Sequence, residues 1–83
     1  MKQMIRVNTG ADLGRTIAVI RSAQSISQAD LAELVGLSPN YISKIETGRT
    51  WTILEHELRV LRRLGATITI EVPSQDPQLT RSG

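Results

Sequence analysis

The stretch that decides the fold runs from Ser27 to Arg49 and reads SQADLAELVGLSPNYISKIETGR. It contains two short helix patterns separated by Gly36, the residue type best suited to the left-handed conformation that ends a helix. Ser38 and Pro39 begin the second pattern, because serine caps free N–H groups and proline at the first helical position loses no hydrogen bond. The second pattern carries polar residues where a core helix would be apolar. The stretch therefore predicts a helix-turn-helix, a unit that places its second helix in the major groove of DNA.

The rest of the chain predicts two further helices and one strand. Thr9 is a good N-cap residue, and apolar residues follow it at helical spacing. Helices are expected over about residues 10–23, 28–35, 39–46 and 53–64. In the last of these, four leucines are expected to face inward: Leu54, Leu58, Leu61 and Leu64. Residues 66–72 alternate strictly between apolar and polar side chains, which predicts a strand with one buried face.

The composition limits the kind of protein this can be. The chain has 83 residues, a formal net charge of +2, no cysteine and 2% aromatic residues. One small domain with a thin aliphatic core is expected, and such cores often depend on a second subunit. The lack of cysteine excludes disulfides and thiolate metal sites. No apolar run approaches the ~20 residues of a membrane span, and the first residues do not form a secretory signal, so a cytoplasmic protein is expected.

We divide the chain into three parts by composition and periodicity. Residues 1–8 form an extended N-terminal segment, residues 9–73 the helix-turn-helix and dimerisation domain, and residues 74–83 a flexible polar tail. Trp51, the only tryptophan, is expected either to fill the small core or to contact DNA or a protein partner. Because the sequence contains no nucleophile–base pair, metal-ligand set or phosphate loop, we expect neither an enzyme nor a cofactor.

The helix-turn-helix stretch resembles a known family at nearly every position of its motif. It is similar to the Cro/repressor (XRE) superfamily at Gln28, Leu31, Ala32, Gly36, Ser38, Ile42, Ser43, Ile45, Glu46 and Gly48. The resemblance implies a mainly α fold, a compact four-helix lambda-repressor-like domain followed here by one C-terminal strand. It also implies that the partner is double-stranded operator DNA, palindromic for a homodimer, and that the protein belongs to the bacterial nucleoid.

Base contacts are expected from the N-terminal half of the second motif helix. Asn40 can form a bidentate pair with adenine, Lys44 can donate to guanine, and Ser43 can also reach a base. Pro39 departs from the superfamily, where glutamine is common, and offers only an apolar contact to a thymine methyl. The alternative is that these side chains are simply the solvated face of a surface helix.

The resemblance assigns further roles around this helix. Gln28 is expected to hold a phosphate and to brace the recognition helix. Arg21 and Glu46 are expected to form a structural bridge that joins the first helix to the end of the third. Other phosphate contacts are expected from Ser38, Tyr41, Thr47 and Arg49.

The predicted strand needs a partner, since a lone strand leaves backbone groups unpaired. The same strand of a second molecule, related by a two-fold axis, is the preferred partner, so that the sheet covers both copies of the fourth helix. The residues of this dimer strand are Thr67, Ile68, Thr69, Ile70, Glu71 and Val72. The alternative is pairing with residues 4–7 of the same chain.

The end of the chain narrows the resemblance. A fourth helix closing in LRRLG (residues 61–65), a terminal strand and a polar tail are similar to the HipB-type antitoxins. This implies a homodimeric repressor that regulates its own operon and binds a HipA-type kinase toxin. The alternatives are a free-standing XRE regulator without a toxin and a protein-interaction module that keeps the fold.

Overall fold

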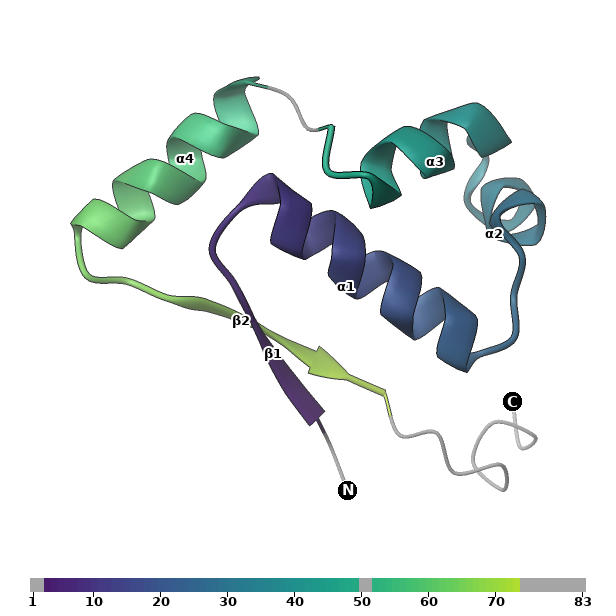
Figure 1. The fold of residues 1–83 in the computed structure, drawn as a ribbon, viewed down its shortest axis with the longest axis horizontal. Coiled ribbons are helices and arrows are strands. Elements are labelled where there is room, and N and C mark those ends of the chain that lie inside the picture. Colours follow the sequence, from purple (N-terminus) through teal and green to yellow (C-terminus); the bar gives the residue numbers. More distant parts are fainter. Residues whose placement is uncertain (1–2, 50–51, 74–83) are drawn as a thin grey trace.

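The computed structural model describes residues 3–49 and 52–73 of the chain (Figure 1). Four helices and a small sheet make up the domain, and their order is β1 (Gln3–Val7), α1 (Gly10–Ala23), α2 (Gln28–Val35), α3 (Pro39–Glu46), α4 (Thr52–Arg63) and β2 (Ile68–Val72). The predicted fold class is confirmed, and α1, α2 and α3 have the predicted bounds. Helix α4 begins and ends one residue earlier than predicted. Trp51 and the tail at 74–83 lie outside the described residues.

Side-chain caps explain why the first helix begins at Gly10. The Thr9 hydroxyl accepts a hydrogen bond from the Asp12 backbone N–H at 3.1 Å, and the Asp12 carboxylate accepts from the Thr9 N–H at 3.2 Å. The same carboxylate accepts from the Asn8 N–H at 2.9 Å. These backbone donors, Asn8 first, lower the pKa of Asp12 below its ordinary value, and Arg15 adds to the effect. The reciprocal arrangement satisfies N–H groups that a helix start leaves open.

Strand β2 pairs with β1 of the same chain, which is the alternative in the sequence analysis rather than its preferred partner. The two strands are antiparallel, with Ile5 opposite Ile70 and Val7 opposite Ile68. Together they form a two-stranded sheet beside α1 (Figure 1). The N-terminal strand can pair with β2 because the four helices bring the later part of the chain back beside it. The strand β2 begins at Ile68, two residues later than predicted, so Ala66 and Thr67 precede it. Within Ile68–Val72 the predicted alternation is present: Val72 is buried, whereas Glu71 is exposed.

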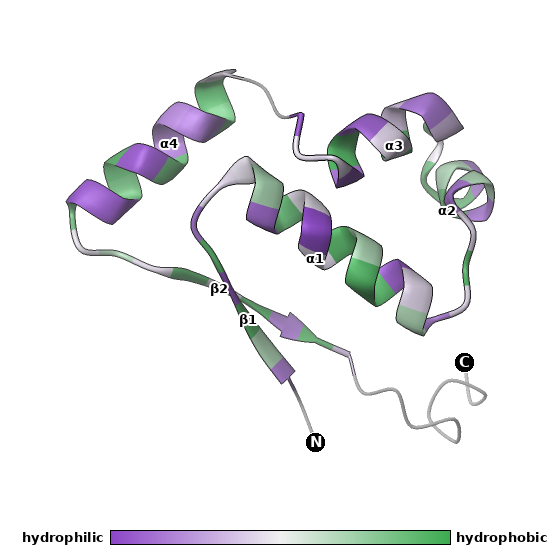
Figure 2. Ribbon diagram, viewed as in Figure 1, coloured by the Kyte–Doolittle hydropathy of each residue, from purple (hydrophilic) through white to green (hydrophobic). Residues whose placement is uncertain are grey.

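The core is small and aliphatic, as the composition predicts. Its buried apolar side chains are Val7, Ala32, Ile42, Leu58 and Val72. Apolar residues occur on every helix, and hydrophilic residues make up much of α4 (Figure 2).

The structure corrects one expectation about α4. Leu58 is 4% exposed and belongs to the core, but Leu64, which the leucine pattern also placed inward, is 75% exposed. At 3.6 residues per turn, ten residues rotate Leu64 about 80° away from Leu54. The helix itself ends at Arg63, so Leu64 leaves the core-facing side.

Gly14 sets the distance between α1 and α3. A Cβ atom added at this position would lie 2.1 Å from the carbonyl oxygen of Ile45 and 3.1 Å from the carbonyl carbon of Glu46. Both are backbone atoms, which cannot rotate away as a side chain can. The two helices therefore pack backbone to backbone at this point, and only glycine permits it.

No helix within residues 3–49 and 52–73 is long and apolar enough to cross a membrane.

Gly14→Ala should destabilise the domain more than Gly36→Ala. The alanine methyl at position 14 must push α3 away from α1, and overpacking of this kind costs about 1–3 kcal/mol or more. Gly36 has a φ of 75° but no atom within 4 Å of an added Cβ, so its alanine should cost only the left-handed strain, about 1–2 kcal/mol. Urea unfolding followed by circular dichroism measures both. Equal stability of the two variants would show that the close approach does not hold in solution.

Candidate nucleic-acid interface

Helices α2 and α3 form the helix-turn-helix unit through three local features. Ser27 caps α2 by accepting from the Asp30 N–H at 3.0 Å, and Ser38 caps α3 by accepting from the Tyr41 N–H at 3.1 Å. Gly36 ends α2 in the left-handed conformation. Pro39 occupies the first turn of α3, where its missing N–H has no partner to lose. The conformation of the turn between α2 and α3 is therefore determined by residues in and next to the turn.

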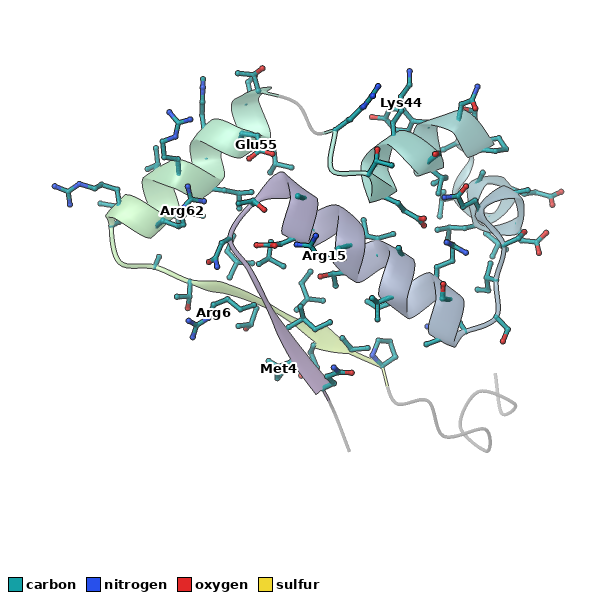
Figure 3. The ribbon with its side chains drawn as sticks, viewed as in Figure 1. Met4, Arg6, Arg15, Lys44, Glu55 and Arg62 are labelled. Carbon is teal, nitrogen blue, oxygen red and sulfur yellow. The ribbon has the colours of Figure 1, made fainter. Side chains whose placement is uncertain are left out.

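The outer face of α3 is largely exposed in the described part of the chain. Pro39, Asn40 and Lys44 are exposed and Ser43 is half-buried. At 3.6 residues per turn these four positions lie within about 140° of one another, on one side of the helix. Lys44 extends from α3 into solvent (Figure 3). The structure thus brings together the four residues expected to contact bases.

The inner face holds α3 against the rest of the domain. Ile42 is 3% exposed, and Ile45 is half-buried. Helix α3 packs on both α1 and α2. In α2 the buried residue is Ala32, at 1% exposure, while Leu34 and Val35 remain exposed.

A network of hydrogen bonds centred on Glu46 ties α3 to both neighbouring helices. Arg21 of α1 donates from Nε to Glu46 Oε2 at 2.6 Å and from Nη2 to Oε1 at 3.1 Å. Gln28 of α2 donates from Nε2 to the same Oε1 at 2.8 Å. Arg21 Nη1 also donates to the carbonyl of Ile26 at 2.8 Å. The structure therefore contains the Arg21–Glu46 bridge that the resemblance suggested.

Burial and charge pairing shift the titration of this pair. The Arg21 and Glu46 side chains are 17% and 6% exposed. The hydrogen bonds from Arg21, and to a lesser degree from Gln28, lower the pKa of Glu46 below its ordinary value of 4.5 despite its burial. The Glu46 carboxylate in turn raises the pKa of Arg21. Both groups are therefore held in their charged forms, which are the forms that the bridge requires.

Three of the five expected phosphate contacts, Gln28, Ser38 and Thr47, have side-chain hydrogen bonds within this structure. Ser38 caps α3, and Thr47 donates from its hydroxyl to the carbonyl of Lys44 at 3.0 Å. Tyr41 is half-buried and Arg49 is exposed. Gln28, assigned to a phosphate by resemblance, is bonded to Glu46. The sequence analysis expects Gln28 to brace the recognition helix, but it does not identify Glu46 as the residue that Gln28 contacts.

Two polar contacts that the sequence did not reveal attach α4 to the start of α1. The Glu55 carboxylate accepts a hydrogen bond from the Gly10 N–H at 3.1 Å. Arg62 donates from Nη1 to the carbonyl of Asn8. Both side chains are on α4 (Figure 3). They fix the helix that follows the motif to the element that precedes it.

The comparisons with known proteins agree with this geometry. Residues 12–68 match the family described as helix-turn-helix domain, and the chain belongs to that family. It is similar to a protein of Sinorhizobium fredii (strain NBRC 101917 / NGR234) called an uncharacterized HTH-type transcriptional regulator y4mF. The two are 31% identical over 70 residues, which cover 84% of this chain and 92% of the relative. No solved structure matches the chain.

Glu46→Gln should destabilise the protein in a pH-dependent way. At neutral pH the loss of charge-assisted hydrogen bonds should lower the free energy of unfolding by about 1.5–3 kcal/mol. Because the folded-state pKa of Glu46 is depressed, its contribution is present above its ordinary value of 4.5 and is lost as the pH falls through the folded value. The difference between parent and variant should therefore shrink in acid.

Urea unfolding at a series of pH values down to about 3 measures this difference. Glu33→Gln on the exposed side of α2 is the matched control and should change stability little at any pH. A parent–variant difference that stays constant into acid would contradict a stabilising Glu46 carboxylate.

Proposed function

We propose that the protein is a DNA-binding transcriptional regulator that reads its site through α3. The observation that carries the proposal is the combination of a largely exposed polar outer face on α3 with a rigid attachment of its inner face. A recognition helix must keep its orientation while its side chains enter the major groove. The Glu46 network and the Gly14 contact supply that rigidity. The name of the 31% identical relative supports the same role.

The α3 side chains match the hydrogen-bond patterns of base edges. Asn40 can pair with N6 and N7 of adenine, and Lys44 can donate to O6 and N7 of guanine. Pro39 can contact a thymine methyl, and Ser43 can donate to or accept from a base. Gln28 has two hydrogens on Nε2, and while one is donated to Glu46 the other can be donated to a phosphate.

The phosphate contacts proposed around these bases come from the edges of the motif. Arg49 lies three residues after the end of α3 and is the strongest of them because it is charged and exposed. The remaining phosphate contacts are proposed for Ser38, Tyr41 and Thr47. Such contacts would set the register of the protein on the duplex without reading its sequence.

A homodimer is proposed because two features of the single chain call for a second copy. The described residues give β2 one neighbouring strand, so the Thr67–Val72 segment can still pair across a two-fold axis on its other side. Val60 on α4 is 55% exposed, and Leu64, just after the end of α4, is 75% exposed. Joining these surfaces in a dimer would cover both and would present two copies of α3 to a palindromic operator.

The resemblance supports a narrower proposal, in which the dimer is the autoregulating antitoxin of a HipA-type kinase toxin. A free-standing regulator of the XRE type is the alternative. The gene beside this one distinguishes them, because an antitoxin is expected next to its toxin. Copurification of the protein with the kinase encoded there would support the antitoxin proposal, and a neighbourhood without a kinase gene would oppose it.

Operator binding should require the outer face of α3. Lys44→Ala and Asn40→Ala should each weaken cognate binding by about 1–3 kcal/mol and relax specificity at one position. Arg49→Ala should weaken cognate and random DNA alike. For a dimer with on the order of 6–10 phosphate contacts, affinity should fall about 10³–10⁵-fold between 50 and 200 mM salt. Mobility shifts on DNA selected from random sequence measure these effects, with Val19→Ala on α1 as the control.

Unaltered operator binding by Lys44→Ala would show that α3 is not the reading helix. A salt response that is nearly flat would favour the protein-interaction module instead.

Aspartate at Val60 or Leu64 should shift the protein from dimer to monomer. Both side chains are exposed in the single chain, so the fold should tolerate the charge, whereas a dimer interface would have to bury it unpaired. Val19→Asp is the matched control, since Val19 is also exposed, at 49%, but on α1. Sedimentation of the three variants and the parent measures the shift. Dimers of parental strength in both the Val60 and the Leu64 variant would place the interface elsewhere.

A further inference from the structure

A groove of about 750 Å³ lies beside the proposed DNA-reading face, between α3 and α4. Its floor includes Leu13 and Gly14 of α1, and its walls include Ile45 of α3 and Ile53 and Leu54 of α4. Ile53 is 69% exposed because the described chain places nothing over it. A volume of this size is within the range of small-molecule sites, which are typically apolar with a few polar groups that orient the ligand.

The charged residues of the groove are unevenly placed. Lys44 and Arg49 line it on the α3 side, and Glu57 lines it on the α4 side. Lys44 extends away from the body of the domain (Figure 3), so its methylene stem borders the groove and its ammonium group is at the rim. An acidic group of a ligand would be attracted to the α3 side and repelled by Glu57. This asymmetry suits a ligand with a single negative charge at one end.

We propose that the groove binds a small amphipathic monocarboxylate whose presence displaces DNA from α3. The apolar chain would lie over Leu13, Ile53 and Leu54, and the carboxylate would pair with Lys44 and Arg49. The mostly apolar lining disfavours a nucleotide or a free phosphate, which would bury polar groups without partners. The displacement rests on the proposed function, because the same two cations are the ones offered there to a base and a phosphate.

Octanoate and 1-octanol form a matched pair of probes, since they share a chain and differ in charge. In titrations of the isotope-labelled full chain, octanoate should saturably shift the backbone amide signals of Leu13, Gly14, Ile45 and Leu54. Charge-assisted pairing should make octanoate bind about tenfold more tightly than octanol. Lys44→Ala should remove most of that preference and leave octanol binding unchanged.

Ile53→Gln tests the groove without altering the proposed DNA face. It should weaken octanoate binding about tenfold by removing apolar surface from the wall, while operator binding without octanoate stays at the parental level. At an octanoate concentration close to the parental dissociation constant, operator binding should weaken in the parent and in the control Val19→Gln, but much less in Ile53→Gln. Octanol at the same concentration should leave operator binding unchanged.

Four outcomes would overturn the proposal. Equal binding of octanol would show that the carboxylate does not contribute to binding. Shifts spread over the whole surface would show that octanoate does not bind in the groove. Octanoate binding only after Trp51→Ala would show that the chain itself occupies the groove. Octanoate that shifts these amide signals but leaves operator affinity unchanged would show that binding in the groove does not displace DNA. The proposed function fails separately, if the parent binds no DNA while octanoate still occupies the groove.

Discussion

The orientation of α3 depends on one carboxylate. Glu46, the last residue of α3, accepts hydrogen bonds from Arg21 of α1 and Gln28 of α2. The Glu46 side chain is 6% exposed, and a buried polar network of this kind is strong when complete and costly when one member is missing. The hydrogen bonds of Glu46 therefore fix the direction in which the outer face of α3 points, while Ile42 and Ile45 pack the helix against the domain. A core with so few aromatic residues gains positional accuracy from this network that shape complementarity alone would not provide.

Helices α3 and α4 are attached to α1 in different ways. At Gly14 the backbones of α1 and α3 meet without an intervening side chain. Helix α4 instead reaches the start of α1 through the long side chains of Glu55 and Arg62. Long polar side chains hold a helix at a greater distance than a glycine contact does. Helix α4 also contributes Leu58 to the core, so its attachment combines apolar burial with these two long polar contacts.

Local chemistry made the helices predictable from the sequence. Ser27, Ser38 and Gly36 act within a few residues of themselves, so the start and end of α2 and the start of α3 followed from reading them. Long-range relations did not follow in the same way. The alternation of residues 66–72 predicted a strand with a buried face, but it carries no information on which strand lies beside it. Gly14 looks like any glycine within a helix until the position of Ile45 is known.

In the candidate site, too, local features could be predicted from the sequence and contacts between helices could not. Exposure of Asn40 and Lys44 followed from helical periodicity, because their positions relative to Ile42 and Ile45 are fixed by 3.6 residues per turn. The bond from Gln28 to Glu46 depends on how α2 crosses α3, which periodicity does not specify. Leu64 was misplaced for a related reason: a leucine repeat drifts around a helix when it is followed for ten residues, and only the packed structure shows where the core ends.

The sheet also has a consequence for the order in which the molecule assembles. Strand β1 comes before all four helices in the chain and β2 comes after them, yet Gln3 lies opposite Val72. During synthesis β1 therefore emerges first and has no partner until β2 is complete. Contacts between neighbours in sequence, such as those of α2 with α3, have a low entropic cost of closure, whereas the sheet closes the longest loop in the domain. On the ribosome the helix-turn-helix unit is thus expected to form before the sheet, which closes the domain last.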